Sequence, residues 1–272
     1  MNYHILNREQ IKRFEEDGYL VVENLFSPAE VQRILETAQI DPQLKADTKA
    51  NQNYDDGEEG LDTILAYRPY LSQDAYSAMA YSRRLIEPME QLLKGEVFHF
   101  YHIIMQKDPG TGGWQYHQDY GYHYRQFLYP DYISCMVALE PAVRENGCIR
   151  VYKGSNRLGR IDHCSSGAQL IADPGRLDIV ARHMEEVHCE LAAGSVLYFH
   201  GNTLHASDPN LSCQGRWSLV GSYAVVSNVW TVSEALNSQN PYPEKLDDEQ
   251  FEAAVRRYWE DVKHNPVAVG DH

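Results

Sequence analysis

Two histidines and an aspartate stand among aromatic residues in one short stretch, WQYHQDYGYHY, which covers residues 114–124. His117 and Asp119 are two positions apart, so an extended backbone would project both side chains from one face and let them reach the same metal ion. Gln118 would then point the other way. A His-x-Asp pair alone is weak evidence, because a histidine near a core is more often a hydrogen-bonded structural residue.

A third metal ligand could come from the segment GSVLYFHGNTLHASDPN, which supplies His200 and His205 beside an apolar strand. Two imidazoles and one carboxylate form a ligand face that leaves positions open, and this face is typical of non-haem Fe(II) oxygenases. Ser207 and Arg216 follow soon after His205. Arginine can hold a carboxylate by a bidentate, charge-assisted pair, which suits a keto-acid cosubstrate that chelates iron at its other end.

Taken together, these motifs resemble the phytanoyl-CoA dioxygenase-like branch of the Fe(II)/2-oxoglutarate-dependent oxygenases, and the resemblance covers most of the chain. The matching segments are FEEDGYLVVENLFSPAEV, the triplet His117-Gln118-Asp119, ENGCIRVYKGSNRLG, and GSVLYFHGNTLHASDPN followed by Arg216. The resemblance implies a mainly β fold with flanking helices. The expected core is a double-stranded β-helix, a cupin-like jelly roll, with N-terminal helices packed on one sheet.

The resemblance also implies roles for single residues. The expected iron ligands are His117, Asp119 and His205, which leaves His200 outside the ligand set. The expected contacts to 2-oxoglutarate are Arg216 at its C5 carboxylate, with Ser207 as an accessory hydroxyl, and the neighbourhood of the apolar Met105 and Met136. Because related halogenases lack the carboxylate that Asp119 supplies, halogenation is disfavoured.

The implied reaction uses Fe(II), 2-oxoglutarate and O2, oxidises a small-molecule substrate and releases succinate and CO2. Hydroxylation of a C–H bond is the expected outcome. Aromatic and polar side chains near the ligand turn are candidates for the substrate wall, because they can orient a small organic molecule; these are Tyr120, Tyr122, Tyr124, Arg125 and, in KGSNRLGR, Arg157. Packing within the sheet is an equally good interpretation of each tyrosine, and His123 is interpreted as a bystander.

Two other classes of protein stay open. A cupin-like metal-dependent hydrolase or isomerase could use the same three ligands around zinc, but it has no stated need for Arg216. A barrel without catalytic activity could bind a small metabolite, although the intact set of ligands argues against it. Formation of succinate from 2-oxoglutarate would separate these classes from the oxygenase.

The elements that must position these residues are suggested by the surrounding sequence. The first part, about residues 1–95, is predicted to be mainly helical, and SPAEVQRILETA begins with a capping box formed by Ser27 and Glu30. Short apolar runs broken by Gly, Pro and Asn predict antiparallel strands of a jelly-roll core over about 96–230. Residues 41–62 are expected to form an exposed loop, residues 155–186 a long connection, and residues 246–264 a C-terminal helix.

Bulk properties limit the possible partners. The 272 residues carry a formal net charge of −15, which disfavours nucleic acids and anionic membranes, so a small molecule is the expected partner. The charge also disfavours a strongly anionic substrate unless Arg68, Arg125 or Arg157 supplies a local positive patch. We expect one oxygenase domain over residues 1–272, and the sequence leaves the oligomeric state open.

Location and redox state follow from two further patterns. The N-terminal segment carries several charged residues where a signal peptide needs an apolar core, and no window reaches transmembrane length, so we expect a soluble, cytoplasmic protein. The five cysteines form no CxxC pair, and their odd number argues against a complete disulfide framework. Free thiols are therefore expected.

Overall fold

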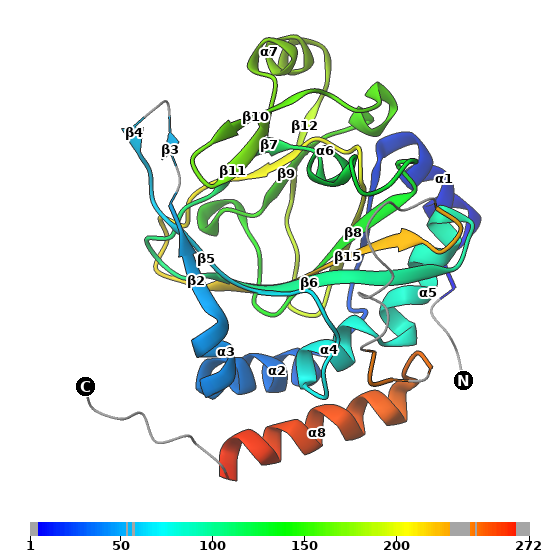
Figure 1. Ribbon diagram of the computed structural model, residues 1–272, viewed down its shortest axis with the longest axis vertical. Helices are drawn as coiled ribbons and strands as arrows, with labels where there is room; N and C mark the ends of the chain where they lie inside the picture. Colours follow the sequence, from blue (N-terminus) through cyan, green and yellow to red (C-terminus); the bar gives the residue numbers. More distant parts are fainter. Residues whose placement is uncertain (1–4, 53, 56–57, 229–239, 243, 265–272) are drawn as a thin grey trace.

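Two facing antiparallel sheets form the centre of the computed structural model, which describes residues 5–52, 54–55, 58–228, 240–242 and 244–264 (Figure 1). Among these residues the larger sheet has seven strands, in the order β1 (Tyr19–Val22), β13 (Val196–His200), β8 (Tyr132–Ala138), β15 (Arg216–Val225), β6 (Val97–Lys107), β5 (Thr63–Arg68) and β2 (Thr48–Asn51). The smaller sheet has four, in the order β12 (Glu186–Cys189), β9 (Ile149–Tyr152), β14 (His205–Ser207) and β7 (Trp114–His117). This arrangement is the mainly β, cupin-like jelly roll with flanking helices that the sequence predicted.

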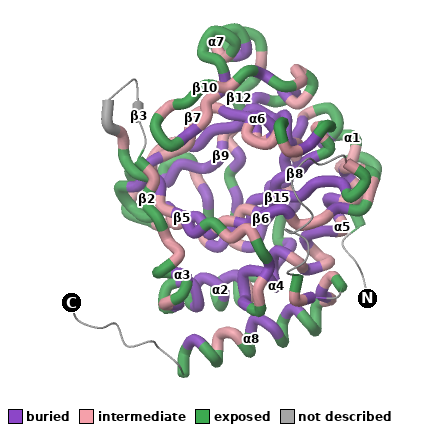
Figure 2. The backbone as a smooth tube through the Cα atoms, in the orientation of Figure 1, coloured by how far each residue is buried: buried purple, intermediate pink, exposed green. Residues whose placement is uncertain are grey.

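The middle of the larger sheet is buried on both faces. All seven residues of β8 are buried between β13 and β15, and the long strands β6 and β15 pair along their whole length (Figure 2). The inner face contributes to an apolar cluster shared with the smaller sheet, which includes Met136, Val151 and Phe199. The outer face is apolar as well, and it is covered by helices.

Helices form a layer on the outer face of the larger sheet. The helices α4 (Ala75–Ala80) and α5 (Arg83–Leu93) contact β6, while α2 (Pro28–Ile40) and α8 (Asp248–His264) pack against each other and against α4 (Figure 1). The predicted capping box is confirmed: Ser27 accepts from the Glu30 amide, and the Glu30 carboxylate accepts from the Ser27 amide at 2.6 Å. Other short elements are α1 (Arg8–Asp17), α3 (Pro42–Asp47), α6 (Asp119–His123), η1 (Arg144–Asn146) and η2 (Ser155–Leu158).

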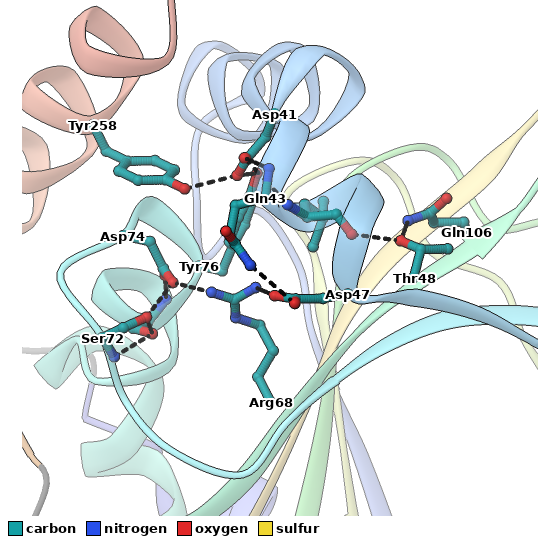
Figure 3. A network of polar contacts seen from close by, with 12 residues as sticks. Asp41, Gln43, Asp47, Thr48, Arg68, Ser72, Asp74, Tyr76, Gln106 and Tyr258 are labelled. Carbon is teal, nitrogen blue, oxygen red and sulfur yellow. Dashed lines mark hydrogen bonds and ion pairs between the residues drawn. The ribbon is translucent and has the colours of Figure 1, made fainter. Parts of the chain in front are cut away.

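A buried polar network joins this helical layer to the edge of the larger sheet (Figure 3). Asp41 accepts hydrogen bonds from the hydroxyls of Tyr76 on α4 and Tyr258 on α8, at 2.9 and 2.8 Å. Arg68 on β5 pairs with Asp47 at 2.9 Å and with Asp74 at 2.7 Å. Because these groups are hydrogen-bonded to one another, the helices and the sheet edge can bury them without leaving polar groups unsatisfied.

Several boundaries differ from the sequence predictions. Residues 41–62 are not simply a loop, since they contain α3, β2, β3 (Tyr54–Asp55) and β4 (Glu58–Glu59). The mainly helical first part contributes β1, β2 and β5 to the larger sheet. The strand β2 was missed because it is a polar strand at a sheet edge, where one side can face solvent and apolar alternation is not required.

The long connection at 155–186 also has its own structure. It forms the hairpin β10 (His163–Ser166) and β11 (Gln169–Ala172), followed by α7 (Pro174–His183). The C-terminal helix agrees with the prediction to within two residues. All five cysteines lie in the described part of the chain and are free thiols. Within the described ranges, none of the helices combines the length and the apolar composition that crossing a membrane requires.

Candidate functional site

Three side chains from the smaller sheet and the turn after it converge on one point. His117 ends β7, Asp119 begins α6, and His205 begins β14 directly opposite His117 in the strand register. The Oδ1 atom of Asp119 lies 3.5 Å from Nε2 of each histidine. Ligand atoms that each lie about 2.1 Å from one divalent metal can be separated by this distance. Within the described residues these three side chains form a group that could hold a metal ion.

Hydrogen bonds on the far side of each imidazole fix its orientation. The Nδ1 atom of His117 lies 2.8 Å from the carbonyl oxygen of Gln115, and Nδ1 of His205 lies 2.9 Å from that of Thr203. A carbonyl oxygen can only accept, so both Nδ1 atoms carry the proton and both Nε2 lone pairs are free for a metal. Burial lowers the pKa of His205 to about 4, which favours the neutral ring that binds metal.

Asp119 is held by a serine on the opposite sheet. Its Oδ2 atom accepts a hydrogen bond from Ser134 on β8, and the Ser134 hydroxyl lies 3.1 Å from that of Ser222 on β15. Burial alone would raise the pKa of Asp119, but His205, His117 and the Ser134 hydroxyl lower it below its usual value. The side chain is therefore an anion that presents Oδ1 to the metal position.

Gln118 anchors the turn between the two ligands, and its predicted orientation away from them is confirmed. Its side chain accepts from the amide of Ile161 at 2.7 Å and donates to the carbonyls of Gly159 and Asn202, both at 2.8 Å. The backbone amide of Gln118 donates to Nε2 of His163 at 2.9 Å. The connection at 155–163 thus braces the metal-binding turn, a role that spacing alone does not reveal.

A buried positive charge lies at another part of the same cavity. Arg216, at the start of β15, is 3% exposed, yet its guanidinium has no ion pair among the described residues. Its Nη1 lies 3.7 Å from the Met136 sulfur, and its Nε has no hydrogen-bond partner in the described part of the chain. Burial lowers the pKa of Arg216 to about 10. A buried cation without an anion is costly, so this site is built for a negatively charged ligand.

Lys107 adds a second basic side chain that sequence reasoning missed. It stands opposite Arg216 in the register of β6 and β15, is buried, and donates from Nζ to the Ser207 hydroxyl at 3.0 Å. Burial and the nearby Arg216 lower the pKa of Lys107 to about 6. Strand alternation contained the signal, because Lys107 is two residues after the cavity-lining Met105 and so shares its face.

The cavity between the two sheets connects these groups. The space between its walls, including the open mouth, is about 690 Å³. The metal-binding triad, Ser207 and Arg216 line it together with mainly apolar side chains, among them Ile103, Met105, Met136, Ile149, Phe199 and Val220. Tyr101, Trp114 and Tyr122 supply aromatic surface.

Of the remaining candidates from the sequence, one lines the cavity and the others lie elsewhere. Tyr122 lines the cavity, whereas the Tyr120 hydroxyl donates to backbone carbonyls of Phe127 and Leu128 inside an aromatic cluster. Three of the candidates are exposed and outside the cavity lining: Tyr124, Arg125 and Arg157. Periodicity could not separate these positions from Tyr122, because the segment after Asp119 turns into the short helix α6.

Comparisons with known proteins agree with this geometry. Residues 14–218 match the family model described as phytanoyl-CoA dioxygenase (PhyH). An ectoine dioxygenase of Bordetella parapertussis is 26% identical over 92% of this chain and 85% of its own length. A probable alpha-ketoglutarate-dependent hypophosphite dioxygenase of Stutzerimonas stutzeri is 25% identical over 82% of this chain and 79% of its own length. The crystal structure of EctD from S. alaskensis with 2-oxoglutarate and 5-hydroxyectoine has a TM-score of 0.67 and 23% identity, over 83% of this chain and 78% of that one.

The chain therefore belongs to the phytanoyl-CoA dioxygenase (PhyH) family, whose members are Fe(II)- and 2-oxoglutarate-dependent dioxygenases. The donor set fits this class, since two neutral imidazoles and one carboxylate form the ligand face of non-haem Fe(II) oxygenases. The unpaired guanidinium of Arg216 fits a cosubstrate with a second carboxylate.

Proposed function

We propose that this protein uses Fe(II), 2-oxoglutarate and O2 to hydroxylate a C–H bond of a small-molecule metabolite, with release of succinate and CO2. The observation that supports this most directly is the buried, unpaired Arg216 in the same cavity as the His117, Asp119 and His205 group. A hydrolytic metal site has no need for such a cation, whereas a 2-oxo diacid has one carboxylate to chelate iron and another to meet the arginine.

Each residue has a defined task in this proposal. His117, Asp119 and His205 bind Fe(II), Arg216 pairs with the far carboxylate of 2-oxoglutarate, and Ser207 supports that carboxylate with its hydroxyl. Lys107 holds Ser207 in place through its 3.0 Å hydrogen bond. Met105 and Met136 pack against the cosubstrate, because both line the cavity near Arg216 and offer apolar contact without competing polar groups.

Positioning is the main contribution of the protein to the reaction. Bound iron would supply the redox chemistry that activates O2 at the expense of 2-oxoglutarate. The far-side hydrogen bonds to Gln115 and Thr203 keep both imidazoles aimed at the metal position, and Ser134 keeps one oxygen of Asp119 directed there. The apolar and aromatic walls exclude water, and Tyr122 becomes the leading substrate contact among the predicted tyrosines.

Arg216→Ala and Arg216→Lys test the assignment of the cosubstrate site. Removing one partner of a buried, hydrogen-bonded charge pair costs about 2–5 kcal/mol, so Arg216→Ala should weaken 2-oxoglutarate binding by roughly 30-fold or more. Lysine should restore part of this affinity, since it keeps the charge but not the bidentate geometry. Anaerobic calorimetry with Mn(II) in place of Fe(II) measures both constants, and metal affinity should stay within about threefold of wild type.

Asp119→Ala provides the complementary variant. It should lose metal affinity and succinate release together, because the carboxylate is the anionic ligand of the group. A wild-type protein that binds metal but neither binds 2-oxoglutarate nor forms succinate from it would instead support the hydrolase, isomerase or silent-barrel alternatives.

We also propose that the chain acts as one oxygenase domain over residues 1–272, since β1 near its start joins the larger sheet and α8 near its end packs on α2 and α4. The cytoplasmic location that the sequence suggests stays a prediction.

A further inference from the structure

Every lysine and arginine of the chain can be placed either at the cavity or away from it. All 24 lysines and arginines lie outside the residues that the structure leaves undescribed. Among them Arg216 lines the cavity, and Lys107 lies behind Ser207 at the same end. The proposed cosubstrate occupies this end with its far carboxylate.

The arginines that could have formed a second positive patch lie outside the cavity lining. Arg68 points into the polar network of the helical layer, where it pairs with two aspartates (Figure 3). Arg160 lies over the Tyr124 ring at 4.2 Å from its centroid and pairs with Asp162. Arg125 is exposed beside Tyr124, and Arg157 is exposed outside the cavity lining. No described cation therefore lines the cavity apart from Arg216.

Acidic side chains are equally few in the described lining of the cavity. Asp119 is the one acidic residue in the described lining of the cavity, and it faces the metal position. The formal charges of a divalent metal, Asp119, Arg216 and 2-oxoglutarate cancel. An anion or a cation on the substrate would be buried without a partner, which opposes binding strongly in an apolar cavity.

A neutral hydrogen-bond donor is nevertheless present. The Tyr122 hydroxyl accepts from the Leu170 amide at 2.7 Å, so its own proton can be donated to another group. The Trp114 ring also lines the cavity, but its Nε1 is buried out of reach of a ligand there. Their rings, with Tyr101, also present aromatic surface to a ligand, and the Tyr67 ring lies 5.1 Å from that of Tyr101.

We infer that the substrate is uncharged where it enters the cavity: an apolar, ring-containing molecule whose carbonyl, ether or hydroxyl oxygen accepts a hydrogen bond from Tyr122. This inference rests on the proposed function and names the class of substrate for the same site. It distinguishes this protein from relatives named for ectoine and hypophosphite, which are charged small molecules.

A pair of probes that differ in charge tests the inference. Methyl 2-naphthoate and 2-naphthoate share one ring system, but the first is neutral and the second is an anion. Their binding is measured anaerobically by calorimetry on the full chain loaded with Mn(II) and 2-oxoglutarate. The ester should bind roughly 10-fold or more tightly than the acid; equal binding, preference for the acid, or no binding of the ester overturns the inference.

Variants test the recognition by the Tyr122 hydroxyl. Tyr122→Phe should weaken binding of the ester by about three- to tenfold but leave binding of naphthalene, which has no acceptor, unchanged. Tyr129→Phe, at an exposed tyrosine, is the matched control and should bind both like wild type. An equal loss for naphthalene and the ester in Tyr122→Phe would mean that the ring, not the hydroxyl, is used, and would overturn the hydrogen-bonding part.

Failure of the proposed function and failure of the neutral-substrate inference give different results. Loss of the proposed function shows as no 2-oxoglutarate binding to the Mn(II)-loaded protein before any probe is added. If 2-oxoglutarate binds, and hypophosphite or ectoine makes succinate release faster than it is without a substrate, the neutral-substrate inference alone is overturned. We expect neither compound to stimulate succinate release.

Discussion

At the scale of single residues, the groups around the metal ligands matter as much as the ligands. Carbonyl oxygens set the tautomers of His117 and His205, and Ser134 holds the oxygen of Asp119 that does not face the two imidazoles. Such partners orient a ligand before the metal arrives, which reduces the entropy lost on binding. Metal affinity should therefore respond to residues that never touch the metal.

Ser134→Ala should weaken Fe(II) or Co(II) binding by roughly 10-fold, because Asp119 loses the hydrogen bond that fixes its rotamer. Ser218→Ala is the matched control: Ser218 is also buried in the larger sheet, but its hydroxyl has no hydrogen-bond partner among the described residues. The absorption spectrum of the Co(II) protein reports ligand geometry directly. A shift in affinity and spectrum for both serines alike would point to a general packing effect.

At the scale of elements, the pairing of β6 with β15 brings two basic side chains together. Lys107 and Arg216 come from distant parts of the chain and become direct neighbours in the strand register. Both are buried without an ion pair among the described residues, so the charge of Arg216 raises the cost of protonating Lys107. A cosubstrate carboxylate that pairs with Arg216 would remove this cost.

Lys107→Met tests this cost through its pH dependence. Burial lowers the pKa of Lys107 to about 6, so the folded protein holds a neutral amine at neutral pH while the unfolded chain, with a lysine pKa of about 10.4, binds a proton. Unfolding is therefore favoured by protonation, and the wild type loses stability as pH falls from about 10 towards 6. Without 2-oxoglutarate, Lys107→Met should melt at a higher temperature than wild type near pH 7.

The difference in melting temperature between Lys107→Met and wild type should shrink as pH rises towards about 9–10. Calorimetric scans at several pH values check this, and the subtraction cancels groups common to both proteins. A gap that stays constant with pH would contradict the lowered pKa, whereas a less stable variant at neutral pH would show that the bond to Ser207 outweighs the cost of burial.

At the scale of the whole molecule, the site and the source of much of the stability lie on opposite faces of the larger sheet. The cavity uses the inner face, while the helical layer and its polar network cover the outer face (Figures 1 and 3). Asp41, Tyr76 and Tyr258 connect α8 to this layer without reaching the cavity. Changes in the polar network of the helical layer should therefore alter stability without altering metal binding.

Tyr258→Phe should lower the free energy of unfolding by about 1 kcal/mol, because it deletes one hydrogen bond to Asp41 while Tyr76 still donates to that carboxylate. Its affinity for metal should equal that of wild type. Denaturant titration and Co(II) binding measure the two quantities, and exposed Tyr129→Phe is again the control. A parallel loss of metal affinity would show that the helical layer and the site are coupled.

The sequence by itself determined the family, the jelly-roll class and the two-residue spacing of His117 and Asp119. These depend on local patterns and on motifs that can be recognised in the sequence without a structure. It also supplied His205, Ser207 and Arg216 as the partners of that pair, which the structure brings to one cavity. Their assignment to iron and to 2-oxoglutarate is the proposal that the experiments above test.

Only the tertiary structure decided which neighbours complete the site. It placed Ser134 on Asp119, Lys107 on Ser207 and the connection at 155–163 around Gln118, and it separated Tyr122 in the cavity from Tyr120 in an aromatic cluster. These contacts join residues distant in sequence or depend on where a strand turns into a helix. Side-chain periodicity describes one element at a time, whereas the charge and polarity of a cavity depend on how several elements pack around it.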